Sequence, residues 1–265
     1  MEGGKAILSI SRSPFRPFSP VPQTTIHLRH YSRSPLSAVS PLHTTSSTLP
    51  EPLKQIHKAG IVACLRAQNV KTAVEAAHAA LAGGVSVLEI VITTPGALEI
   101  IKVLCKDYPS VKFGIGTVLN IEDARKLTKA GAQFLMSPCT VMEILHWFRG
   151  SEILYIPGVM TPTEIFSAYN AGAEVVKVYP VSALGGEKYI STLRKPFPTI
   201  PMIASQGITT GSVGKYINAG ASAVVLSDAI FDKEAMIKED FDEIKRLAHL
   251  VTIEASLARK GNSKL

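Results

Sequence analysis

Short apolar runs rich in β-branched residues recur along the chain from residue 60 onward, separated by stretches with helical periodicity. The runs alternate little with polar residues, which is typical of parallel strands that are covered on both faces. Their starts are about 20 to 27 residues apart, enough for one strand, one helix and two short loops. The eight predicted strands are residues 61–65, 87–92, 113–118, 134–137, 154–159, 175–179, 202–204 and 223–226.

The junctions between these elements carry helix-capping residues. Glycine precedes a strand in four places, where we expect it to end a helix in the left-handed conformation. Thr161 opens a Thr-Pro-Thr-Glu stretch, the pattern of an N-cap with a capping box. Asn120, and Thr209 or Thr210, are predicted to begin helices similarly. The glycine junctions are Gly83 with Gly84, Gly131, Gly172 and Gly220.

Eight strand–helix units in one uninterrupted series predict an α/β fold, a single (β/α)8 TIM barrel. An open, doubly wound sheet of eight strands is the alternative. The barrel is favoured because no GxGxxG motif follows the first strand. In such a barrel the chemistry takes place at the C-terminal ends of the strands.

Residues 1–50 differ in composition from the rest of the chain. They hold five Lys or Arg against one Glu, seven of the 17 prolines and fifteen Ser or Thr. This composition predicts a disordered transit peptide ahead of a barrel domain at residues 51–265. The Ser, Thr and Pro content favours a chloroplast address, whereas the Arg-His-Tyr-Ser stretch at 29–32 keeps the mitochondrion as the alternative.

The remaining 215 residues carry only +3 of the net charge of +7, which argues against a nucleic-acid-binding surface. No apolar run approaches the ~18 residues of a membrane span. The three cysteines contain no Cys-x-x-Cys pair and the seven histidines no His-x-x-x-His pair. We therefore expect a soluble protein with neither a disulfide framework nor a bound metal.

Lys177 is the residue most suggestive of chemistry, because it interrupts an apolar strand. Alternation places Val175, Lys177 and Tyr179 on one face, which would be the barrel interior. Burial disfavours an ammonium group, and a neutral amine can attack a ketone and form an iminium that accepts electrons. The alternative is a lysine that extends to solvent or pairs with an acid.

Glu89 interrupts the second strand, where a buried carboxylate is costly unless it is paired or functional. Facing inward, it could transfer protons between the lysine, a carbinolamine hydroxyl and a product alcohol. The alternative is a structural ion pair between Lys177 and Glu89.

Further polar residues are expected at the mouth of the barrel. Thr117 ends the third strand after glycines that would let a ligand approach the backbone, and its hydroxyl suits a carboxylate oxygen. Arg66 closes the first strand and suits a phosphate or carboxylate. After the seventh and eighth strands, where barrels often bind phosphate, Ser205, Gly207 and Ser227 could donate hydrogen bonds.

Between about residues 53 and 257 the chain resembles the 2-keto-3-deoxy-6-phosphogluconate (KDPG) aldolase / 4-hydroxy-2-oxoglutarate aldolase family of class I lyases. The segments that carry the resemblance are VACLRA (62–67), GVSVLEI (84–90), GTVLN (116–120), GAQF (131–134), SP (137–138), PGVMTPTE (157–164) and VKVYP (176–180). The resemblance implies a homotrimer that uses no metal or organic cofactor. It also implies a small-molecule 2-oxo acid as the substrate, with no nucleic acid or membrane partner.

The resemblance also implies roles for single residues. Lys177 would be the Schiff-base lysine, Glu89 the acid/base and Thr117 a contact to the pyruvyl carboxylate. The other implied contacts are with Pro138 and Tyr179, which would line the pocket, and with Arg66, which would bind the phosphate. The implied reaction cleaves a KDPG or 4-hydroxy-2-oxoglutarate type substrate to pyruvate and an aldehyde. A 2-oxo diacid (oxaloacetate) decarboxylase using the same lysine, and a non-catalytic metabolite-binding barrel, are the alternatives.

Several positions depart from the family pattern. Thr93 stands where many members have an arginine that binds the substrate carboxylate. Residues 204–207 read Ala-Ser-Gln-Gly where the family commonly has Pro-Thr-Gly-Gly, so Gln206 replaces a glycine. Leu226 replaces the usual glycine before Ser227. Gln206 and Leu226 add side chains where backbone would meet phosphate, so they bear on the phosphorylated substrate more than on the Schiff-base chemistry.

Overall fold

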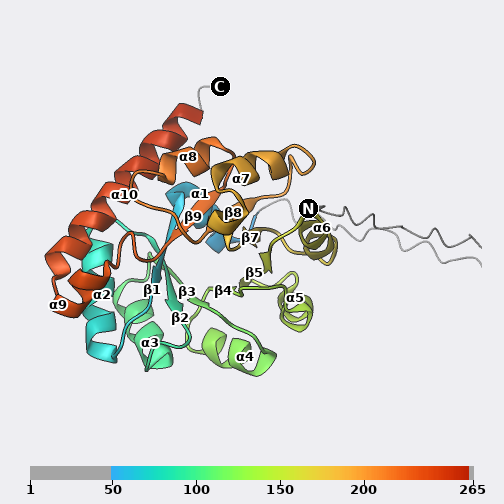
Figure 1. Ribbon diagram of the computed structural model, residues 1–265. Coiled ribbons are helices and arrows are strands. Elements are labelled where there is room, and N and C mark those ends of the chain that lie inside the picture. Colours follow the sequence, from blue (N-terminus) through green and yellow to red (C-terminus); the bar gives the residue numbers. More distant parts are fainter. Residues whose placement is uncertain (1–48, 263–265) are drawn as a thin grey trace, which may run out of the picture. The chain divides into compact units, whose positions relative to one another are not determined.

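The computed structural model describes residues 49–262, which form a barrel of parallel strands surrounded by helices (Figure 1). The strand order is β5-β4-β3-β2-β1-β9-β8-β7-β6, and every pairing is parallel. Of the predicted transit peptide, all but the last two residues lie outside the described range. The strands are β1 (Ile61–Leu65), β2 (Val87–Val91), β3 (Lys112–Gly116), β4 (Phe134–Met136), β5 (Leu154–Ile156), β6 (Gly158–Val159), β7 (Val176–Val178), β8 (Met202–Ser205) and β9 (Ala223–Leu226).

The two edge strands of this sheet, β5 and β6, are consecutive and are separated only by Pro157. Proline has no N–H to donate, so the ladder is interrupted there. Its carbonyl still accepts a hydrogen bond from the N–H of Lys177, 2.9 Å away. Because one segment thus joins both edges, the sheet closes into the predicted eight-unit barrel, and the predicted strand 154–159 is observed in two pieces.

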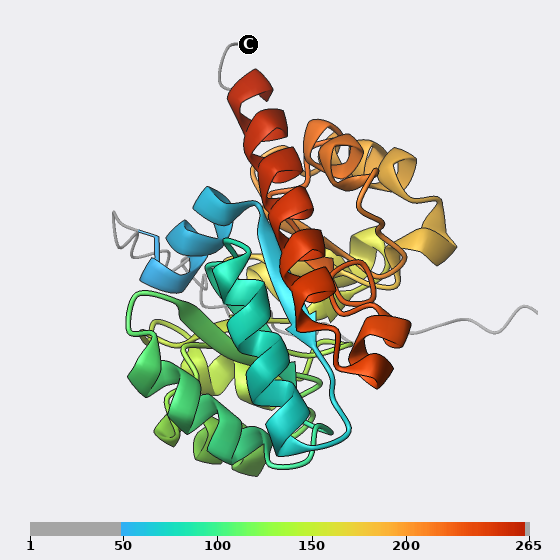
Figure 2. The same cartoon turned by 90° about the vertical axis from the view of Figure 1, so that its left-hand side faces the viewer.

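A helix follows each strand unit and covers the outside of the barrel (Figure 1). The 22-residue helix α10 packs against α2 and α8, and Figure 2 shows it alongside α2. No helix between residues 49 and 262 is long and apolar enough to cross a membrane. The helices are α1 (Glu51–Ala59), α2 (Val70–Ala82), α3 (Ala97–Asp107), α4 (Ile121–Lys129), α5 (Met142–Phe148), α6 (Pro162–Asn170), η1 (Val181–Leu184), α7 (Glu187–Arg194), α8 (Val213–Asn218), α9 (Lys233–Lys238) and α10 (Phe241–Asn262).

The barrel interior is an apolar cluster distinct from the larger core between strands and helices. Helix α1 contributes Leu53 and Ile56 to this inner cluster, so it closes the N-terminal end of the barrel. The strands add the rest of the cluster, which comprises Val62, Val87, Phe134, Met136, Leu154, Ile156, Val175, Ile203, Ala223 and Val225. Among residues 49–262 the N-terminal end is thus filled, and the C-terminal ends of the strands form the open end of the barrel.

Most of the predicted helix boundaries are confirmed. Left-handed glycine follows a helix at Gly84, Gly131, Gly172 and Gly220, with φ between 101° and 117°. The side chain of Asn120 caps α4, and Thr161 forms the full capping box with Glu164 at the start of α6.

The predicted helix start at Thr209 or Thr210 is wrong. There the chain forms a turn in which the Ser212 N–H donates to the Thr209 carbonyl, and α8 begins at Val213. The Thr209 N–H donates to the Ser212 hydroxyl, 2.9 Å away. The side-chain bond therefore closes the turn instead of capping the helix.

Candidate active site

Lys177 and Glu89 both lie inside the barrel, on β7 and β2. Only 6% of Lys177 and 3% of Glu89 is exposed. Two residues earlier in each segment, Val175 and Val87 belong to the inner apolar cluster. Because residues two apart share one face of a strand, the amine and the carboxyl face the interior at the open end of the barrel. The inward orientation predicted from alternation is thus confirmed.

The carboxylate of Glu89 lies directly against Gly116, the last residue of β3. A Cβ atom added to Gly116 would be 1.5 Å from Oε1 of Glu89 and 2.5 Å from its Cδ. The sequence suggested that glycine here makes room for a ligand. The structure shows instead that the space holds the chain's own carboxylate.

The environment of Glu89 sets its protonation. Burial raises the pKa of its carboxyl, and the positive charge of Lys177, a hydrogen bond from Cys64 and the positive charge of Arg66 partly offset this effect. Among the described residues no direct ion pair joins Lys177 to Glu89, and Oε2 of Glu89 has no hydrogen-bond partner. A buried carboxyl with a raised pKa and a free oxygen is suited to exchanging protons with a bound molecule.

Thr117 follows Gly116 in an unusual backbone conformation. Its φ of 64° is left-handed, which is rare for a β-branched residue. Ile115 and Val118 both pack in the outer core, although strict alternation would place residues three apart on opposite faces. The left-handed residue therefore interrupts the alternation of inward-facing and outward-facing residues. Thr117 is half-buried and lies at the barrel mouth next to Gly116.

Tyr179 and Pro138 follow β7 and β4 at the same end of the barrel. The Nζ atom of Lys177 lies 5.4 Å from the centre of the Tyr179 ring, which is 36% exposed. Half-buried Pro138 packs against Gly158 of β6, where an added Cβ would be 2.3 Å from the Pro138 carbonyl carbon. The structure thus places both predicted pocket residues at the end of the barrel that holds Lys177.

A pocket of about 840 Å³ adjoins this site between the ends of β1, β2 and β9 and the helix α9. Arg66, Thr93 and Ser227 line it, together with charged residues in and around α9. Of these charged residues, Lys233 forms an ion pair with Asp228, 3.6 Å away. No hydrogen bond or ion pair within residues 49–262 occupies the Arg66 guanidinium, so Arg66 is available to a bound anion.

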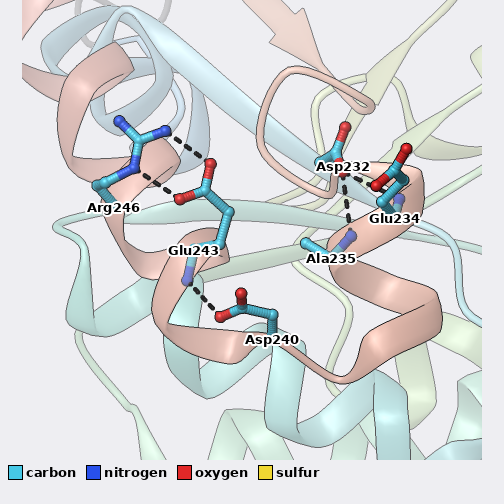
Figure 3. A network of polar contacts seen from close by, with 6 residues as sticks. All are labelled: Asp232, Glu234, Ala235, Asp240, Glu243 and Arg246. Atoms are coloured by element: carbon cyan, nitrogen blue, oxygen red, sulfur yellow. Dashed lines mark hydrogen bonds and ion pairs between the residues drawn. The ribbon is translucent and has the colours of Figure 1, made fainter.

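Side-chain hydrogen bonds cap α9, which lines the pocket, and stabilise the start of α10, which follows it (Figure 3). The Asp232 side chain accepts from the N–H of Ala235, 3.0 Å away, and caps α9. The Asp240 side chain accepts from the N–H of Glu243, 3.1 Å away, at the start of α10. Arg246 donates twice to Glu243, with both distances 2.6 Å.

The predicted phosphate loop after β8 differs from an open cradle. Ser205 is buried and Gly207 is exposed, and Gln206 between them has a φ of 86°. A glutamine therefore occupies a left-handed position that favours glycine. Its side-chain oxygen accepts a hydrogen bond from the Ser182 hydroxyl in η1. Leu226, which also departs from the family pattern, is fully buried in the outer core.

Sequence reasoning missed Cys64 as a neighbour of the site. Cys64 pairs in register with Glu89, and burial raises the pKa of its thiol well above the usual value. Alternation with Val62 of the inner cluster could have identified Cys64 as inward-facing. Of the other cysteines, Cys139 is exposed.

Comparison with known proteins agrees with this geometry. The family model described as KDPG and KHG aldolase matches residues 53–247. The KHG/KDPG aldolase of Escherichia coli is 30% identical over 188 residues, which cover 71% of this chain and 88% of the relative. The 2-dehydro-3-deoxy-phosphogluconate aldolase of Pseudoalteromonas atlantica is 33% identical over 194 residues, with coverages of 71% and 87%.

A solved structure of KDPG aldolase from Legionella pneumophila, with pyruvate captured as a covalent carbinolamine intermediate, superposes with a TM-score of 0.71. It is 26% identical, and the match covers 77% of this chain and 98% of that one. The KDPG aldolase of Zymomonas mobilis ZM4, solved with 3-phosphoglycerate, gives a TM-score of 0.69 at 26% identity, with coverages of 77% and 96%. The chain therefore belongs to the KDPG and KHG aldolase family, whose named members are lyases that cleave carbon–carbon bonds.

Proposed function

We propose that the chain is a class I aldolase in which Lys177 forms a Schiff base with a 2-oxo acid and releases pyruvate and an aldehyde. The observation that carries the proposal is that a buried lysine and a buried glutamate with one unbonded carboxyl oxygen lie at the same open end of one barrel. A lysine and a glutamate removed from water in this way are costly to the fold, and such groups cluster at functional sites.

The chemistry follows from the two groups. Once it has lost its proton, the amine of Lys177 adds to the C2 carbonyl, and loss of water from the carbinolamine gives an iminium. The Glu89 carboxylate removes the proton of the C4 hydroxyl, the C3–C4 bond breaks, and its electron pair forms an enamine with C2 while the aldehyde leaves. Glu89 returns the proton to C3, and water then hydrolyses the iminium to pyruvate and the free amine.

Among the family's substrates, we propose that an unphosphorylated 4-hydroxy-2-oxoglutarate type acid is preferred. Gln206 places a side chain, held by Ser182, in the loop where barrels commonly bind phosphate through backbone amides. The adjoining pocket also carries acidic Asp228 and Glu239 beside its cations. Arg66 can match the single charge of a carboxylate there, whereas a phosphate dianion would bring a second negative charge next to these acidic groups.

Pyruvate release tests both parts of the proposal. The wild-type protein should release pyruvate from 4-hydroxy-2-oxoglutarate, and Lys177→Arg, which keeps the charge but cannot form a Schiff base, should lose measurable turnover. Turnover that survives in Lys177→Arg contradicts the mechanism. Gln206→Gly should raise the ratio of kcat/KM for the phosphorylated over the unphosphorylated acid by about tenfold or more. A wild-type ratio that already favours the phosphorylated acid contradicts the substrate preference.

We also propose a homotrimer located in the chloroplast. Large apolar side chains are exposed on neighbouring outer helices, with Trp147 of α5 57% and Phe166 of α6 56% exposed, which suits a protein interface. The composition of residues 1–50 supports the location. Light scattering of the purified protein and the destination of a fluorescent fusion test the two statements, and a monomer or mitochondrial import would contradict them.

A further inference from the structure

A buried chain of hydroxyl groups lies beneath the loops that follow β3 and β4. Ser137 is fully buried, and its hydroxyl donates to the Val118 carbonyl, 2.5 Å away. The Tyr155 hydroxyl, on a side chain that is 4% exposed, donates to the Ser137 oxygen at 3.0 Å. Tyr155 in turn accepts from the N–H of Val141, also at 3.0 Å. The sequence alone predicted no role for the Ser137 or Tyr155 hydroxyl.

These bonds hold Val118, the residue that follows Thr117. The N–H of Val118 donates to the Met136 carbonyl, 3.1 Å away, so both polar groups of Val118 are bonded. Thr117 itself has a left-handed backbone, which is unfavourable for a β-branched residue and persists only where the surroundings impose it. The hydrogen bonds to both the N–H and the carbonyl of Val118 impose such a constraint on Thr117.

We propose that Ser137 and Tyr155 are positioning residues for Thr117, and that their hydrogen bonds fix its hydroxyl for the carboxylate of the 2-oxo acid. The inference rests on the proposed function. Neither side chain needs to touch the substrate, because each acts through the Val118 peptide. Burial raises the pKa of Tyr155, so its hydroxyl stays protonated and remains a donor to Ser137 at ordinary pH.

Tyr155→Phe removes the hydroxyl while it keeps the ring that packs in the core. The readout is covalent trapping of pyruvate by borohydride, measured as a function of pyruvate concentration. We expect the half-saturating pyruvate concentration to rise about 3- to 10-fold, as for the loss of one hydrogen bond, with the maximal trapping rate changed less than about twofold. Tyr108→Phe, at the C-cap of α3, is the matched control and should leave both values unchanged.

The same substitution made in a protein that already lacks the Thr117 hydroxyl distinguishes positioning of that hydroxyl from a general loss of stability. In Thr117→Ala, which lacks the hydroxyl to be positioned, Tyr155→Phe should add less than about a twofold effect. Ser137→Ala should reproduce the Tyr155→Phe result and decides the matter if Tyr155→Phe does not fold. An unchanged half-saturating concentration in both variants, or a full additional effect in Thr117→Ala, overturns the inference. A wild-type protein that traps no pyruvate would instead overturn the proposed function.

Discussion

Gly116→Ala places one methyl group where the Glu89 carboxylate now lies. The added Cβ would be 1.5 Å from Oε1, whereas ordinary contact begins at 3.4 Å, so the oxygen must move by about 1.9 Å. Misplacement of a catalytic group by about 1 Å can cost about 100-fold, and loss of general acid–base catalysis costs about 10²- to 10⁴-fold. We therefore expect kcat to fall by about 10²- to 10⁴-fold.

The control is Gly114→Ala, two residues earlier on the same inward face of β3. Its Cβ would be 2.3 Å from the Phe134 ring, so it strains the inner core but not the site. Both variants should lose about 1–3 kcal/mol of unfolding free energy in urea, as overpacked cores do. Only Gly116→Ala should lose activity in a steady-state pyruvate-release assay. A Gly116→Ala enzyme within about fivefold of the wild-type kcat would refute the role given to Glu89, because the general acid–base contribution is at least about 10²-fold.

Two further predictions follow from the pKa of Glu89 and from the capping box of α6. Burial raises the pKa of Glu89, so the carboxylate is lost as the pH falls through a value above that of an ordinary glutamate. In a pH profile, kcat/KM should therefore decrease as the pH falls through the raised pKa of Glu89, and this decrease should be absent in Glu89→Gln. An unchanged decrease in Glu89→Gln contradicts the role of Glu89 as the base. Thr161→Ala breaks the capping box and should lower the unfolding free energy by about 0.5–2 kcal/mol. Thr163→Ala, at the second residue of the same helix, is its control, and equal losses in urea unfolding would contradict the role of the cap.

The barrel could be predicted because its determinants are local and repeat along the chain. Apolar runs of strand length, left-handed glycines and the Thr161 cap each reflect the conformation of a few neighbouring residues. The predicted start of α8 was wrong because a side chain there forms a hydrogen bond other than the helix cap that we expected. At Thr209 the backbone N–H bonds to Ser212, and this turn delays the start of α8.

For the site, alternation was enough to identify Lys177 and Glu89 as inward-facing. The contacts between strands could not be predicted from alternation, because they depend on the register of neighbouring strands and on where the alternation is interrupted. The approach of Glu89 to Gly116 joins two strands, and the left-handed Thr117 breaks the alternation on which the prediction relied. The Ser137–Tyr155 bond likewise joins β5 to the residue that follows β4.

Reduction by borohydride in the presence of pyruvate, followed by peptide mapping, decides whether Lys177 forms the Schiff base. We predict one covalent pyruvate adduct for each chain, located on Lys177 and absent from Lys177→Arg. An adduct on another residue, or no adduct at saturating pyruvate, would contradict it.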